Sequence, residues 1–212
     1  MGGRFEMRPV ALFAGLLAGF LIIPSLAQSP PPEGTPTRIR GTVEKLDAQI
    51  LSVKSRDGQN LTITLAPNVT VSAVVRKTIA DVKTGDFIAS TGLKGSDGKL
   101  HAVELRILPE SLRGALAESQ GPWDSIPDSV MTNATAGMIT ETPAGHVVHV
   151  TFKGQESEFI VDKDTGIYGY VSGDFSLLKP GAAIFTVALK KTDGSLTAAR
   201  ITAEKDGVKP PL

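Results

Sequence analysis

The triplet Asp164-Thr165-Gly166 follows the apolar run Phe159-Ile160-Val161 and could supply one carboxylate for peptide hydrolysis. Such chemistry needs two carboxylates that share one proton. The corresponding positions in the first half of the chain hold Asn68-Val69-Thr70, so the chain itself offers no second carboxylate. Asp-Thr-Gly is also a common turn sequence. We therefore expect no catalytic residue, and an aspartic-type hydrolase built on a homodimer is the least favoured alternative.

His146 and His149 are the candidates for metal binding, with oxygen ligands from Asp124 and Asp128. Residues three apart on a strand point to opposite faces, so the two imidazoles share one ion only if the strand is bulged. Partly exposed strand histidines are the simpler interpretation. An accessory role in metal handling or transport is thus an alternative function, and no cofactor is expected.

The segment 109–133 carries the sole tryptophan, Trp123, and four acidic residues against the single basic residue Arg113. Long connections without strand signal tend to be functional loops or linkers. We therefore predict an acidic linker in which Trp123, Asp124 and Arg113 contact a partner. The structural alternative is that Trp123 fills the open end of a barrel.

The N-terminus has the layout of a secretory signal peptide. Arg4 and Arg8 precede an uncharged, largely apolar run over 10–23, and Ser25-Leu26-Ala27 supplies small residues before a cleavage point. That run is shorter than the roughly 20 residues that cross a bilayer as a helix. We expect a periplasmic or secreted protein that meets the membrane only through this segment, if it stays uncleaved. No second apolar run of that length follows, which argues against a channel or permease.

Composition narrows the classes of partner. The chain has 22 basic and 22 acidic side chains and no cysteine. Because Arg4, Arg8 and Glu6 would leave with the signal peptide, 20 basic and 21 acidic side chains remain and the net charge becomes minus one. A near-neutral chain has no overall field for a polyanion, so we expect no nucleic-acid partner. Without cysteine there is no disulfide framework and no thiolate chemistry.

The elements that position these residues occur twice. Shifted by 96 positions, Lys83-Thr84-Gly85 falls on Lys179-Pro180-Gly181, and Asp97-Gly98 falls on Asp193-Gly194. The same shift places Gly41 on Gly137. Most matched residues form turns or buried apolar positions, which is typical of a duplicated fold and not of a duplicated active site.

Apolar residues alternate with a period of two in both copies, as half-buried strands do. The first copy predicts strands around 39–43, 51–53, 61–65, 69–71, 87–93 and 100–108, with one helical turn near 78–82. The second predicts strands at 135–141, 147–152, 156–161, 167–171, 182–190 and 196–203. Five or six short strands in each copy favour a small barrel. A sandwich formed by both copies is the alternative.

The predicted organisation is therefore all-β, with two tandem barrels of five to six strands after an N-terminal signal helix. The expected segments are a signal peptide at 1–27, a proline-rich tether at 28–37, barrels at 38–108 and 134–204 on either side of the acidic linker 109–133, and a C-terminal tail at 205–212.

Several of these patterns resemble a known family. Gly41-Thr42-Val43, Val82-Lys83-Thr84-Gly85-Asp86 and Asp97-Gly98-Lys99-Leu100-His101-Ala102 resemble a bacterial exported domain of unknown function. The resemblance implies OB-like barrels, often in tandem, and no known catalytic residues. Similar alphaproteobacterial chains, including the stretches Pro122-Trp123-Asp124 and 131–135, are sometimes labelled metal ABC transporter permease. The single short apolar segment argues against that label.

The leading hypothesis is a non-enzymatic exported binding or adaptor protein whose contact surface includes the acidic linker. Its partner would be an envelope protein or a small ligand. Duplicated fold-determining residues without duplicated chemistry favour this hypothesis over an enzyme.

Overall fold

The computed structural model describes residues 1–3 and 34–210 of the chain, and those from 34 onward belong to one compact unit. The predicted signal peptide, except its first three residues, and most of the predicted tether lie outside the described part. Within that part no helix is long and apolar enough to span a membrane.

The described part is all-β, with strands joined by hairpins and three short 3-10 turns. The first half contains β1 (Thr35–Asp47), β2 (Ile50–Ser55), β3 (Asn60–Arg76), β4 (Phe87–Lys94), β5 (Leu100–Ile107) and β6 (Ser119–Pro122). The second half contains β7 (Val130–Thr142), β8 (Gly145–Phe152), β9 (Gln155–Val161), β10 (Gly166–Ser172), β11 (Ala183–Lys190) and β12 (Leu196–Ala203). The 3-10 turns are η1 (Ile79–Asp81), η2 (Glu110–Leu112) and η3 (Phe175–Leu177).

Several boundaries differ from the expected ones. The strands expected near 61–65 and 69–71 are one continuous strand, β3. β1 begins at Thr35, where the predicted tether has not yet ended, because Thr35 already pairs with Lys190 of β11. The predicted acidic linker holds β6 and the start of β7, which pair with each other.

Five strands form a closed barrel in the order β12-β11-β1-β2-β3, with β12 returning to pair with β3. Inward positions alternate along each strand, as in Leu51 and Val53 of β2. Their side chains meet Ile63 and Ile201 in one buried cluster, together with Leu178 from the chain beyond η3. This closed barrel is the first of the two packed regions.

The second strand set has the order β5-β4-β7-β8-β9. Its outer strands β5 and β9 are joined by one bridge, His101 to Ile160. Ile88, Leu105 and Phe159 are among the side chains that fill its interior. β10 extends the sheet between the two regions, because it pairs in parallel with β5 and antiparallel with the end of β3.

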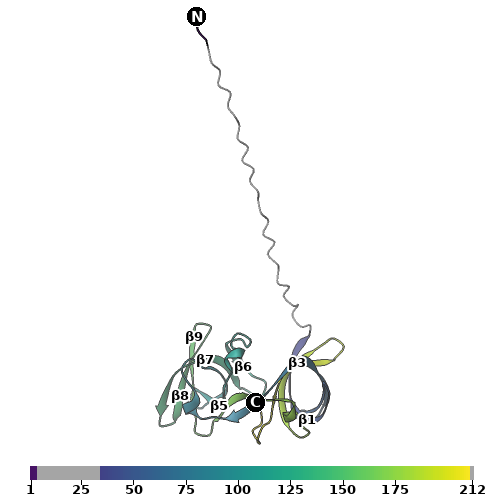
Figure 1. Cartoon of the computed structure of the whole chain (residues 1–212). Coiled ribbons are helices and arrows are strands. Elements are labelled where there is room, and N and C mark those ends of the chain that lie inside the picture. Colours follow the sequence, from purple (N-terminus) through teal and green to yellow (C-terminus); the bar gives the residue numbers. More distant parts are fainter. Residues whose placement is uncertain (4–33, 211–212) are drawn as a thin grey trace. The chain divides into compact units, whose positions relative to one another are not determined.

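The expected arrangement of one barrel per repeat is wrong, because the closed barrel takes strands from both repeats. β1, β2 and β3 come from the first repeat, whereas β11 and β12 come from the second. In return β4 and β5 of the first repeat complete the strand set of the second. Figure 1 shows this exchange as blue and yellow strands standing together in the closed barrel. β3 is 17 residues long and carries the chain out of the barrel before β4 begins.

The exchange is symmetric. In the β3–β10 pair, Ser72 lies opposite Ser172 and Arg76 opposite Tyr168. Under the shift of 96, Ser72 corresponds to Tyr168 and Arg76 to Ser172. Ser72 therefore pairs with the equivalent of Arg76 under this shift, and Arg76 pairs with the equivalent of Ser72, as at the two-fold axis of an isologous dimer. The two strand sets exchange hairpins in this symmetric way.

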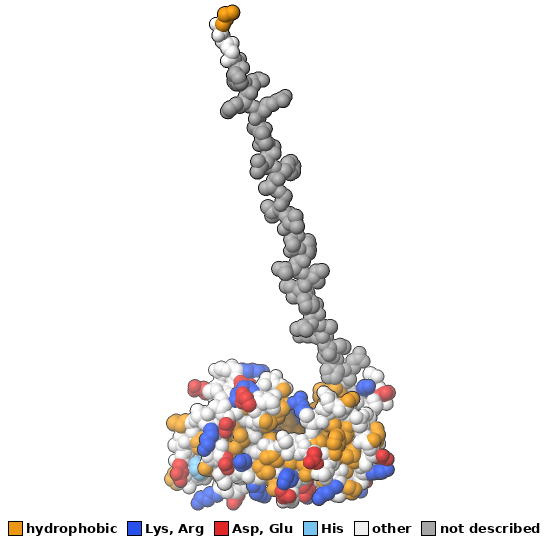
Figure 2. Space-filling view, in the orientation of Figure 1, with side chains coloured by type: hydrophobic (Ala, Val, Ile, Leu, Met, Phe, Trp, Pro, Cys, Tyr) orange, Lys and Arg blue, Asp and Glu red, His pale blue; other side chains and the backbone are white. Residues whose placement is uncertain are grey.

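A third apolar cluster lies on the outer face of the second strand set. It contains Phe87, Ala89, Leu108 and Met131, and Trp123 packs against it from the segment between β6 and β7. Figure 2 shows hydrophobic side chains gathered around a hollow between the two packed regions. This cluster holds the linker segment in place and so positions the site described next.

Candidate functional site

Trp123 lies under two arginines of β1. The Arg38 guanidinium carbon is 4.4 Å from the centroid of the indole, and that of Arg40 is 5.6 Å away. Both distances are within the range of cation–π attraction. The strand pattern explains the pairing, because Arg38 and Arg40 flank the buried Ile39 and so share the outer face of β1.

Asp124 holds the same two arginines. Its carboxylate oxygens lie 3.5 Å from Nη1 of Arg38 and 3.3 Å from Nη2 of Arg40. Arg38 and Asp124 are about half exposed, whereas the Arg40 side chain is only 14% exposed. We refer to Arg38, Arg40, Trp123 and Asp124 as the Trp123 cluster.

Arg40 is the buried member of the cluster. Its guanidinium carbon is also 5.1 Å from the ring centroid of Phe185, which lies opposite it on β11. Loss of hydration on burial lowers the pKa of Arg40, and the ion pair and hydrogen bond with Asp124 offset part of that effect. The charges of Arg56 and Arg38 lower the pKa further. The surroundings of Arg40 are therefore positively charged, with Asp124 as the compensating carboxylate.

Several buried polar atoms near the cluster have no hydrogen-bond partner. In the described part of the chain such side-chain atoms are Nε of Arg40, Nε1 of Trp123, Oγ of Ser125 and Nε of Arg106. The first three lie in or beside the Trp123 cluster. Buried polar groups are nearly always satisfied by protein or ordered water, so this concentration requires a physical reason.

A shallow depression of about 520 Å³ lies next to the cluster. Its lining residues come from β6, the following loop and the start of β7, namely Gln120, Gly121, Pro122, Trp123, Asp128, Ser129 and Val130. The loop is closed by hydrogen bonds from the Trp123 amide to the Ser129 carbonyl and from the Ser129 hydroxyl to the Ile126 carbonyl. Trp123 therefore forms one wall of a depression open to solvent.

Arg113 lies apart from the other two predicted partner-binding residues. Its guanidinium donates to Oγ1 of Thr135 at 2.7 Å and to the Gly85 carbonyl at 2.8 Å, and it lies 5.1 Å from the Phe87 ring. A hydrogen bond to Glu110 raises the pKa of Arg113. These contacts fasten the linker to the second strand set.

The candidate metal ligands are not assembled. Asp124 is engaged by arginines, His149 lies 3.5 Å from Glu158, and His146 is on the opposite face of β8. Asp128 lies in the loop beside the depression. Among the described residues there is no group of three or more His, Cys, Asp or Glu side chains suited to a metal ion.

Asp164 is exposed in the turn between β9 and β10. In this triplet, Thr165 makes the hydrogen bonds that hold the turn. The Thr165 hydroxyl donates to the Ala102 carbonyl at 2.9 Å and accepts from the Asp162 amide at 2.9 Å. The sequence Asp-Thr-Gly thus forms a turn that is tied to β5.

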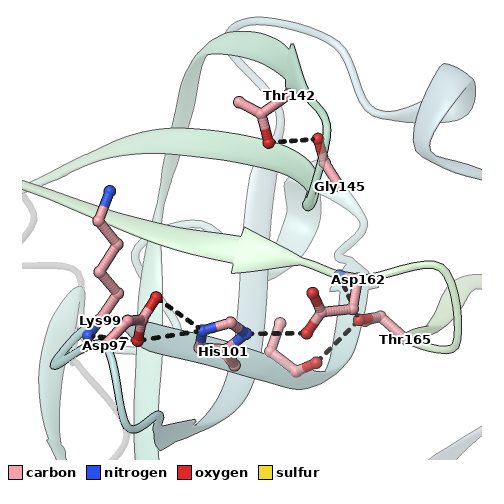
Figure 3. A network of polar contacts seen from close by, with 8 residues as sticks. Asp97, Lys99, His101, Thr142, Gly145, Asp162 and Thr165 are labelled. Carbon is pink, nitrogen blue, oxygen red and sulfur yellow. Dashed lines mark hydrogen bonds and ion pairs between the residues drawn. The ribbon is translucent and has the colours of Figure 1, made fainter.

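Sequence reasoning gave no role to His101, which joins the two repeats (Figure 3). Its Nδ1 is 2.9 Å from Oδ2 of Asp162, and its Nε2 is 3.2 Å from Oδ2 of Asp97. Hydrogen bonds to Asp162 and then to Asp97 raise the pKa of His101. No local pattern indicates this contact, because Asp162 is 61 residues away.

A buried charged pair lies on the outer face of the second strand set. Nε of Arg106 is 3.4 Å from Oε1 of Glu104, and the same oxygen accepts a hydrogen bond from Thr91 at 3.1 Å. Both charged side chains are more than nine-tenths buried. Removing one partner of a buried ion pair strongly destabilises the folded state, because the other charge is left buried and unpaired. This pair is therefore a structural element of the sheet.

Comparison with known proteins found no relative of this chain. No family model, no curated protein and no solved structure matches the chain. The functional argument therefore depends on the site itself.

Proposed function

We propose that this chain is a non-enzymatic exported binding or adaptor protein built on two OB-like units, with the Trp123 cluster as its contact surface. One observation carries the proposal. A large aromatic ring, two arginines and buried polar atoms without partners converge beside an open depression. Trp and Arg are enriched where proteins bind their partners.

The resemblance to an exported domain and the signal-like N-terminus support the periplasmic or secreted location. The topology supports a binding role, since parts of the chain that are far apart in the sequence build the cluster and its surroundings. Arg38 and Arg40 belong to the first repeat, Phe185 belongs to the second, and Trp123 belongs to the segment between them. A surface assembled in this way is lost if either repeat unfolds.

The metal-handling alternative has less support. A carboxylate held by two arginines is a poor ligand, because a cation would have to displace both guanidinium groups from Asp124. The hydrolase alternative has a simple test. If the purified protein cleaves no peptide, that alternative is excluded, and an Asp164→Asn variant should behave as the parent does.

The sole tryptophan makes the main test specific to the site. Signal-free protein is titrated with acidic peptides, carboxylated oligosaccharides and divalent metals, while Trp123 fluorescence and thermal stability are recorded. A ligand of the native state raises the melting temperature by mass action. We expect at least one anionic class to change the fluorescence and the melting temperature together.

Two variants of β1 provide the comparison. Arg38→Gln removes a charge next to Trp123, whereas Lys45→Gln removes an exposed charge that pairs with Asp47 at 3.0 Å. Binding should weaken in the first variant and persist in the second. If no class of ligand changes either signal, the proposed function is wrong.

A further inference from the structure

The loop that carries Trp123 and Asp124 bridges two parts of the fold. It connects β6 to β7, which belong with the second strand set. Its Asp124 carboxylate nevertheless pairs with Arg38 and Arg40 on β1 of the closed barrel. A carboxylate of the chain itself therefore occupies the pair of guanidinium groups.

Several features of the docked loop are energetically unfavourable. Trp123 Nε1, Ser125 Oγ and Arg40 Nε are buried there without a hydrogen-bond partner. Asp128 adopts a φ of 60°, a left-handed conformation that a non-glycine residue adopts at a cost. Each feature costs free energy in the docked state, so a better-fitting occupant of the arginine pair can displace the loop.

The charges indicate which occupant fits. Arg56 lies close enough to Arg40 to act on it electrostatically, and its amide donates to the Arg40 carbonyl at 2.7 Å. The charges of Arg38 and Arg56 thus both act on Arg40, and Asp124 is the carboxylate that pairs with Arg38 and Arg40. A segment with more than one acidic side chain would neutralise this charge more completely.

We propose that Trp123 and Asp124 form a latch over Arg38 and Arg40, and that an acidic peptide segment of a partner protein displaces it. The proposal rests on the proposed function and names its partner class. A peptide is favoured over a sugar acid because the present occupant is itself a peptide carboxylate next to an aromatic residue. The unlatched Trp123 then becomes available to the incoming segment.

The latch makes Asp124 an internal competitor, and apparent affinity falls with the fraction of molecules that are latched. Asp124→Asn removes the competing charge. We expect this variant to bind an acidic peptide about 3- to 10-fold more tightly than the parent, given the modest strength of ion pairs made by the half-exposed Asp124 carboxylate. Asp47→Asn is the control, because it removes the same charge from an exposed residue of β1 whose ion pair is with Lys45 and not with the Trp123 cluster.

The probe is a synthetic peptide with the sequence of residues 120–128, in which Trp123→Phe leaves the protein as the only source of tryptophan fluorescence. A second peptide also carries Asp124→Asn. Both are titrated into the signal-free parent, Asp124→Asn, Asp47→Asn and Arg38→Gln proteins. Circular dichroism verifies that each variant is folded.

The proposal predicts that the acidic peptide binds the Asp124→Asn protein most tightly, the parent and Asp47→Asn proteins equally, and the Arg38→Gln protein least. The second peptide should bind more weakly throughout. Equal affinity of the parent and Asp124→Asn proteins would overturn the latch. If an alginate oligomer shifts Trp123 fluorescence and the peptide does not, the partner class is wrong while the proposed function stands. If peptides, alginate and divalent metals all leave Trp123 fluorescence and the melting temperature unchanged, both the latch and the proposed function are wrong.

Discussion

His101 should make the stability of the second strand set depend on pH. β5 and β9 share the single bridge from His101 to Ile160, whereas β12 and β3 of the closed barrel pair over several residues. The His101 side chain strengthens this weak seam through Asp97 and Asp162. The repeat equivalent of His101 is Thr197, so His101→Thr is the substitution that the fold already accepts at this place.

The sign of the effect follows from the direction of the pKa shift. The pKa of His101 is raised in the folded protein, so the folded state favours the protonated ring. Its contribution is fully present below the unfolded pKa, near 6.5, and is lost as the pH rises through the raised folded value. The pKa of Asp97 is lowered, chiefly by the Lys99 amide, so its contribution disappears only in acid. We refer to the contacts of His101 with Asp97 and Asp162 as the His101 clasp. It is strongest between about pH 5 and 6.5.

The magnitude is modest because the His101 side chain is 30% exposed. Exposed ion pairs contribute about 0.2–1 kcal/mol each, so the two contacts together give about 1 kcal/mol. For a unit of this size that corresponds to a melting-temperature change of roughly 2–4 °C.

The assay is urea denaturation of the parent and His101→Thr proteins at about pH 5.5 and 8.5. The variant should lose about 1 kcal/mol relative to the parent at the lower pH and much less at the higher one. His146→Thr controls for loss of a strand histidine, and the pair of His149 with Glu158 contributes the same background to all three proteins. An equal loss at both pH values would refute the clasp.

Three further outcomes are expected. Gly41→Ala should lower the free energy of unfolding by about 1–3 kcal/mol, because the new Cβ would lie 2.5 Å from the Lys54 carbonyl oxygen. Urea denaturation should show a smaller loss for Gly137→Ala at the equivalent position, where the nearest atom would be 3.2 Å from the new Cβ. Ser72→Cys with Thr202→Cys should form a disulfide under mild oxidation, because the two hydroxyls are 3.1 Å apart; its absence on non-reducing gels would contradict the strand exchange. Arg113→Ala should cost about 1–3 kcal/mol and increase proteolysis of the linker, since it leaves the Gly85 carbonyl without that donor; unchanged proteolysis would show that Arg113 does not hold the linker.

Part of the site was predictable and part was not. Trp123 and Asp124 stand out in the sequence because an acidic segment with the sole tryptophan is unusual between strand-rich repeats. Their contact with Arg38 and Arg40 is absent from any local pattern, since Asp124 lies 84 residues from Arg40. The period of two does place both arginines on one face of β1. The alternation therefore predicts that the two arginines share a face, but it does not identify Trp123 and Asp124 as their partners.

Arg113 is a second residue whose contacts the sequence does not indicate. As the only basic residue of its segment it looked like a partner contact. The fold instead uses it to bind Thr135 and the Gly85 carbonyl, because these acceptors are brought to the linker by β7 and the turn before β4.

Apolar alternation and Asp-Gly or Lys-x-Gly turns act over a few residues, so the sequence alone predicts most of the strands and turns, although not β6. It did not determine which hairpin completes which barrel. The β4–β5 and β11–β12 hairpins have matching apolar patterns, so either fits the open side of either set. Long-range contacts in the fold set the exchange, through the length of β3 and the symmetric pairing of β3 with β10. The contact of His101 with Asp162 exists because of that exchange, which brings β5 beside the end of β9.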